Sequence, residues 1–138
     1  MSPQSLFLRA NLEAERHKYL ESQKAGRDLG HQAIADWHRR HWTLWLRERW
    51  LEHLLGTTRY EEFEPERFAR LPALFAERSD LLAEVVEMVR RGAENADILF
   101  WAASERRDLR VVVRILVELR LNEIRCSRYC FDFARTPP

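Results

Sequence analysis

The segment between Gly30 and Gly56 constrains the fold more than any other part of the chain. It contains no proline and no glycine, and four of the five tryptophans fall within it, at positions 37, 42, 45 and 50. An uninterrupted segment of this length is typical of one long helix, and a glycine directly after it is a common helix end. We therefore predict a continuous helix over residues 30–55 that organises the rest of the fold.

The apolar side chains of this segment form two stripes at helical spacing, whereas a surface helix needs only one. Either the helix lies at the centre of the domain, or its second stripe contacts another chain. A closed two-fold dimer is the commonest oligomer, so we predict a homodimer that uses the second stripe. The first stripe holds Ile34, Trp37, His41, Trp45 and Leu55, and the second, the predicted interface, holds Trp42, Leu46, Trp50 and Leu54.

Capping residues and apolar periodicity predict further helices. One begins near Ser5 or Asn11 and ends at Ala25, with Gly26 after it. Glu64 and Pro65 suit a helix start, and Pro72 predicts that this region splits into two short helices. The remaining predicted helices run from Ser79 or Asp80 to Gly92, over 95–104 as a short buried helix, and over 109–129 with Asp108 as its cap.

The β-branched run over 111–117 would also suit a buried strand. Leu109, Val112, Val113, Leu116 and Leu119 repeat at helical spacing, however, and no turn residue interrupts them. We prefer a helix here. The predicted fold is all-α, a single domain over 1–138 built as a bundle of five or six helices around the Trp-rich helix.

The composition limits the classes of function. Hydrophobic residues make up 46% and charged residues 33%, which is typical of a folded chain, and the net charge is only +1. Such a balance gives no overall attraction to nucleic acid or anionic lipid. No apolar stretch approaches the length that a bilayer span needs, and no signal peptide is visible. We expect a protein of the bacterial cytoplasm with no membrane partner.

All five histidines lie in the first 53 residues, which raises the hypothesis of a metal- or ligand-binding helical enzyme. If a metal binds, His31, His38 and His41 are the candidate ligands. The Glu-x-x-His and His-Glu-x-x-His patterns are absent. The alternative is that His38 and His53 are partly solvated and His41 packs on Trp37 and Trp45. We favour no metal and no cofactor.

Two further groups of residues receive structural interpretations. Cys126 and Cys130 lie one helical turn apart, and we interpret them as small buried hydrophobes. The cluster of Arg106, Arg107, Arg110 and Arg114 suggests a DNA-binding helix. Acidic neighbours dilute that cluster, so we interpret it as a solvated face and consider nucleic-acid binding unlikely.

The least generic stretch runs from Glu15 to Gly30, with His17-Lys18-Tyr19 followed by Gly26-Arg27-Asp28-Leu29-Gly30. This pattern resembles a family of uncharacterised bacterial proteins of unknown function. Some of them are similar to the segment that follows a lipopolysaccharide-kinase-like domain. The resemblance covers residues 13–45 and implies no known reaction.

At this helix-helix corner, Asp28 can cap the second helix and Gly26 can adopt a positive φ. Under the structural interpretation, the residues of this corner only hold the two helices together. The functional interpretation is a site for a small anionic ligand, formed by His17, Lys18, Arg27 and Asp28 near a helix N-terminus. No motif for nucleophilic catalysis or phosphate binding is present. The leading hypothesis is a non-catalytic protein-interaction or regulatory module that forms a homodimer.

Overall fold

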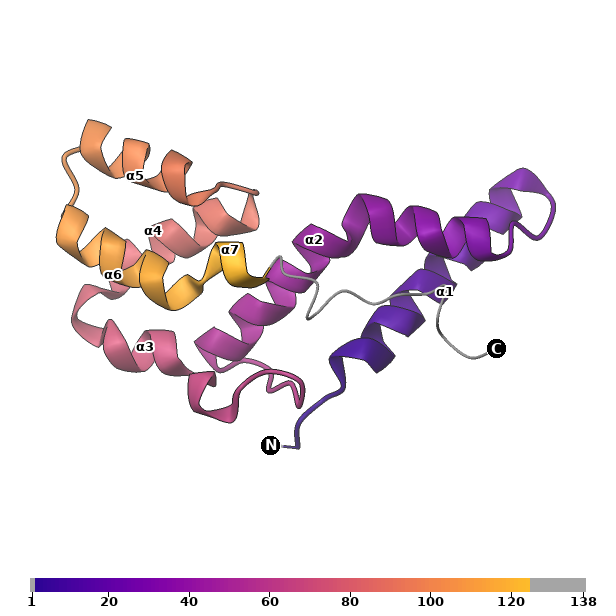
Figure 1. The fold of residues 1–138 in the computed structure, drawn as a ribbon, viewed down its shortest axis with the longest axis horizontal. Coiled ribbons are helices and arrows are strands. Elements are labelled where there is room, and N and C mark those ends of the chain that lie inside the picture. The colour runs from indigo at the N-terminus through magenta and orange to yellow at the C-terminus, as the bar shows by residue number, and fades with distance from the viewer. Residues whose placement is uncertain (1, 125–138) are drawn as a thin grey trace.

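The computed structural model describes residues 2–124, which fold into an all-α arrangement (Figure 1). Within this range the only β-type pairing is an isolated bridge between Gln4 and Tyr60. The predicted fold class is confirmed. The elements are α1 (Leu6–Ala25), α2 (His31–Leu55), η1 (Pro65–Arg67), α3 (Arg70–Leu74), η2 (Ala76–Arg78), α4 (Ser79–Arg90), α5 (Asn95–Ser104), α6 (Leu109–Leu119) and α7 (Leu121–Ile124).

Helix α2 is continuous, as predicted, and joins the two parts of the structure (Figure 1). On one side α1 runs antiparallel along it, so that Arg9 approaches Glu52 and His17 bonds to Asp36. On the other side, α3, α4 and α7 pack against it, α6 packs on α4, and α5 packs on α6. The Trp50 indole N–H donates to the carbonyl of Leu119 at 2.6 Å and fixes α2 against the end of α6.

The second apolar stripe of α2 is buried within the single chain. Its four side chains, Trp42, Leu46, Trp50 and Leu54, are at most 4% exposed and belong to one core cluster. The predicted dimer interface is therefore wrong for these residues, because a side chain already packed inside the monomer has no surface left to bury against a partner. The first of the two alternatives, a central helix, is confirmed.

Local caps define most helix ends. Ser5 accepts from the N–H of Leu8, and Glu62 accepts from the N–H of Leu6 at 2.6 Å, so the first turn of α1 has two acceptors. Gly26 ends α1 at φ +70. Asp108 accepts from the N–H groups of Arg110 and Val111, as predicted. These contacts satisfy backbone groups that a helix leaves unpaired at its ends.

The structure corrects two other predictions. Pro72 lies inside the first turn of α3, where its missing N–H costs nothing, and the break falls at Ala69, whose φ is +59. Residues 109–119 are helical, but the helix ends at Leu119 because Arg120 adopts a φ of +49. Cys126, Cys130 and the predicted continuation to Tyr129 lie outside the described residues. No helix in residues 2–124 has the length and apolar character needed to cross a bilayer.

Candidate functional site

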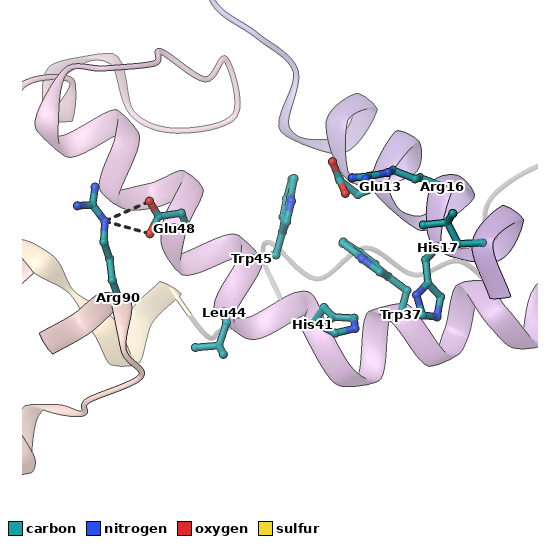
Figure 2. Close-up of a pocket in the computed structure, with 10 residues that line it drawn as sticks. Glu13, Arg16, His17, Trp37, His41, Leu44, Trp45, Glu48 and Arg90 are labelled. Atoms are coloured by element: carbon teal, nitrogen blue, oxygen red, sulfur yellow. Dashed lines mark hydrogen bonds and ion pairs between the residues drawn. The ribbon is translucent and has the colours of Figure 1, made fainter. Parts of the chain in front are cut away.

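A groove of about 560 Å³ lies between α1 and the middle of α2, and Arg90 of α4 closes one end (Figure 2). Two indoles and two aliphatic side chains provide its apolar surface, and two histidines and four charged groups provide its polar surface. The lining residues are Glu13, Arg16, His17, Leu20, Trp37, His41, Leu44, Trp45, Glu48 and Arg90. Figure 2 shows the imidazoles of His17 and His41 close together beside Trp37.

The imidazole of His17 is held by a carboxylate from the opposite helix. Its Nε2 lies 3.2 Å from Asp36 Oδ2, and its ring meets the ring of His41 edge-on at 5.8 Å. Desolvation raises the pKa of Asp36, but the hydrogen bond from His17 and the charges of Arg40 and Arg39 outweigh it, so the pKa lies below its usual value. Asp36 therefore stays ionised near neutral pH and orients His17.

No side-chain hydroxyl or thiol of residues 2–124 lies beside the oriented imidazole of His17 in this groove. The lining residues in the described part of the chain include no serine, threonine or cysteine. Glu48 and Arg90 neutralise each other, with Nε at 3.2 Å from both carboxylate oxygens. A histidine oriented by aspartate needs an adjacent hydroxyl or thiol for covalent catalysis. The groove that the described residues form therefore lacks the hydroxyl or thiol that a Ser- or Cys-type covalent mechanism uses.

The structure does not bring the four predicted ligand residues together. His17 lies nine residues before Gly26, about 13 Å along the helix axis, and it bonds to a carboxylate. Lys18 lies 3.9 Å from Glu15. Arg27 and Asp28 are exposed in the turn. Asp28 accepts from the N–H of Gly30, one residue before α2, and makes no cap to a helical N–H.

The candidate metal ligands diverge. His31 is exposed at the start of α2, His38 stacks on Trp42 at 5.2 Å, and His41 faces His17 and Trp37. Residues 2–124 hold no group of three or more His, Cys, Asp or Glu side chains arranged to hold a metal ion. His17 and His41 share the groove, but the three candidate metal ligands do not form one site.

His53, expected to be partly solvated, is buried and acts as a structural bridge. Its Nδ1 accepts from the N–H of Tyr60 at 3.2 Å, so Nε2 carries the proton and donates to the carbonyl of Glu64 at 2.9 Å. This tautomer follows from the fixed donor and acceptor on the backbone. Burial, together with the charge of Arg59, lowers the pKa of His53 despite the opposing bond to Glu64.

An apolar outer face on α5 and α6 is the feature that the sequence analysis missed. Helix α5 was predicted to be buried, yet only Ile98 and Ala102 are buried in it, and Phe100 is 76% exposed. Val117 is 65% exposed. We call this surface the outer face, and its members are Ala96, Leu99, Phe100, Ala103, Leu109, Val113 and Val117.

The signal for the outer face was present in the sequence. The run Ile98-Leu99-Phe100-Trp101-Ala102-Ala103 is apolar on every side of a helix. A helix of this kind is normally enclosed, but a single layer of helices behind α5 covers only one side of it. The predicted helix over 95–104 is confirmed, and its complete burial is not.

Comparisons of the chain with protein families, with curated proteins and with solved structures find no match. The chemistry of its surfaces is therefore the evidence on function.

Proposed function

We propose that this protein is a non-catalytic helical interaction module of the bacterial cytoplasm, and that the outer face of α5 and α6 binds an apolar helical surface of a protein. The observation that carries the proposal is the exposure of Leu99, Phe100, Val113 and Val117 on one side of a helix pair. Exposed apolar patches rimmed by charge are typical of protein-binding sites.

The free energy at stake is large enough for recognition. Burying one large apolar side chain is worth about 1.5–3 kcal/mol, and Phe100 leaves three quarters of its surface in water. Aromatic anchors of this kind are common in binding hot spots. A protein partner that covered the outer face would recover this energy, whereas water does not.

The same face argues against the nucleic-acid alternative. Arg107 is paired with Glu84 at 2.8 Å, and Arg114 lies over the ring of Phe75 at 5.3 Å. Beside these arginines, the exposed stripe of α6 is Leu109, Val113 and Val117. A helix that reads a DNA groove presents polar groups to base edges and phosphates. An aliphatic stripe is suited to a protein surface.

Site-specific photo-crosslinking in the native bacterium tests the proposal. A benzophenone amino acid at position 100 or 117 should give discrete protein adducts, because both positions lie on the outer face. The matched control is position 39, where the arginine side chain is 74% exposed on α2. Leu99→Ser should suppress the adducts from position 117. Equal adduct yields at positions 39, 100 and 117, or none at all, would contradict the proposal.

A further inference from the structure

We infer that the occupant of the outer face is a second copy of this chain, paired about a two-fold axis that runs parallel to α5 and α6. This inference rests on the proposed function, since it names the partner of the same surface. It follows from the way charge is distributed on the two sides of the apolar stripe.

Helices α5 and α6 form an antiparallel hairpin. A shallow hollow of about 360 Å³ is lined by Asn95 and Leu99 of α5, by Val113 and Val117 of α6, and by residues up to Glu123. The start of α5 therefore lies beside the end of α6, and the short connection over 105–108 lies at the other end of the hairpin. The outer face is a nearly flat strip two helices wide.

The flank on the α6 side is basic. Arg110 and Arg114 are one turn apart and exposed, and the cation-π contact of Arg114 with Phe75 shows that they lie on the side of α6 turned toward α3. Figure 1 shows α3 and α5 on opposite sides of α6. Neither guanidinium makes an ion pair within residues 2–124.

The flank on the α5 side is acidic. Asp97 and Glu105 lie one turn before and one turn after Trp101 and share its side of the helix. Trp101 lines a hollow with Glu84, Glu87 and Arg107. Glu84 is paired with Arg107 and Glu87 with Arg91, so the net negative charge of this flank comes from Asp97 and Glu105. Within the described part of the chain, Asp97 and Glu105 have no cationic partner.

Two in-plane axes can pair this face with itself. An axis perpendicular to the helices places α6 on α6 and sets the basic flanks together. An axis parallel to the helices places α6 of the second copy on α5 of the first. The basic flank of each copy then lies on the acidic flank of the other, and residues at the same distance from their own 105–108 connections face each other. Arg110 then meets Glu105 of the second copy, twice by symmetry. Like-charge contacts penalise the first arrangement and opposite-charge contacts favour the second.

The size of the face sets the strength of the pairing. Ten and eleven helical residues give a strip about 16 Å long and about 20 Å wide, well below the roughly 800 Å² per partner of a standard interface. A small interface of this kind supports weak and reversible association. We expect a dissociation constant in the micromolar range, with the charged flanks determining the orientation.

Sedimentation equilibrium on the purified full chain tests the pairing with a charge swap. Arg110→Glu puts an acid in the first turn of α6, and Glu105→Arg puts a base at the end of α5. Both changes agree with the helix dipoles, so the fold should persist. Each variant alone should dimerise about 10-fold more weakly than the wild type. An equimolar mixture should return to wild-type affinity, since both cross-pairs become attractive. The control is Lys24→Glu, which reverses an exposed charge on α1, and it should leave the dissociation constant of the dimer unchanged.

The outcomes separate the two proposals. A wild-type chain that stays monomeric at several hundred micromolar overturns the inference, and a mixture no tighter than its components overturns the two-fold arrangement. If crosslinks from position 100 still identify another protein, the proposed function stands with a different partner. If no specific crosslinks form either, both fail. Phe100→Ser should weaken the self-association about 100-fold, because the ring is lost on both sides of the axis.

Discussion

The imidazole of His53 makes the stability of the protein depend on pH. Its ring is fully buried, and burial places its folded-state pKa below the usual value of 6.5. As the pH falls, His53 therefore binds a proton in the unfolded chain at a higher pH than it does in the folded chain. The contribution of His53 to stability is complete above about pH 6.5. Below that pH it decreases by at most about 1.4 kcal/mol per pH unit, until the folded form also titrates.

Urea unfolding between pH 7.5 and pH 5 measures this dependence. His53→Gln should lower the free energy of unfolding at pH 7.5, since the N–H of Tyr60 and the carbonyl of Glu64 lose their bridge. It should also flatten the decline below pH 6.5. His31→Gln removes an exposed histidine and should leave the slope unchanged. A His53→Gln variant with the wild-type slope would show that this ring does not control the acid sensitivity.

Arg47 fixes the start of α5 to α2. Its guanidinium is only 2% exposed, bonds to Glu94 at 2.8 Å and donates to the carbonyl of Ala93 at 3.2 Å, while its Nε has no hydrogen-bond partner. Glu94 is 39% exposed, so water can replace the lost cation there. The cost of Arg47→Ala should come mainly from lost packing and the unpaired carbonyl, about 3 kcal/mol.

Arg47→Met separates packing from charge. It retains the aliphatic volume and removes the partnerless Nε, so chemical denaturation should show a loss of about 1 kcal/mol, smaller than for Arg47→Ala. Arg91→Ala, on an exposed side chain paired with Glu87, is the reference and should cost at most about 0.5 kcal/mol. Equal losses for Arg47→Met and Arg47→Ala would show that the ion pair dominates.

At the level of elements, the end of α2 depends on a close approach of two backbone segments. Gly56 adopts a φ of +83, and a Cβ placed there would lie 2.8 Å from the Cβ of Ala69. Gly26, at the end of α1, has a φ of +70 and open space around it. Gly26→Ala should therefore cost about 1 kcal/mol for backbone strain alone, and Gly56→Ala about 3 kcal/mol, because a clash is added.

Ala69→Gly provides the matched test. Ala69 itself has a φ of +59, so replacing it by glycine should stabilise the protein by about 1 kcal/mol. In combination with Gly56→Ala it should also remove the 2.8 Å contact and leave the Cα of residue 69 at 3.3 Å. The double variant should therefore be more stable than the sum of the two single effects predicts. Thermal or urea unfolding of the four variants measures this. Strict additivity would exclude the steric explanation.

The elements also show what the sequence could predict. Helix starts with local signals, such as Ser5 and Asp108, were predictable because the capping side chain lies within three residues of the N–H it serves. The end at Gly26 was predictable because glycine readily adopts the positive φ found there. The breaks at Ala69 and Arg120 were not. Ala69 donates its N–H to the carbonyl of His53, and Arg120 reaches toward Glu64. Such positive φ values are imposed by contacts between distant segments, so the residue type at the position does not predict them.

The candidate site had the same limitation. Periodicity identified both apolar stripes of α2, of which the second is fully buried and the first only in part. A helical pattern does not show which element covers a stripe. The second stripe was therefore assigned to a partner although the chain covers it. The pairing of His17 with Asp36 depends on the register of α1 against α2, which follows from the whole hairpin. The outer face was visible in the composition of residues 98–103, since no side of a helix there is polar.

On the scale of the whole molecule, α1 and the rest of the core differ in how much apolar surface they bury. Helix α1 buries Leu6, Ala10 and Ala14 fully, two of which are alanines. The C-terminal half of α2 buries Trp50, Leu51 and Leu54 against a cluster that includes α4 and α6. Buried apolar area largely sets local stability. The α1 helix should therefore open before the remaining helices unfold.

Native-state hydrogen exchange in increasing urea should resolve two steps. Amides of α1 should exchange through an opening several kcal/mol below global unfolding, and amides of α4 and α6 only through global unfolding. Glu62→Gln tests the connection, because its carboxylate accepts from the N–H of Leu6 and the hydroxyl of Ser5. That variant should lower the α1 opening energy by about 1–2 kcal/mol and leave the free energy of the second step, measured from the α1-open state, unchanged. If all helices exchange with one free energy, α1 belongs to the same cooperative unit, and small buried side chains suffice to hold it there.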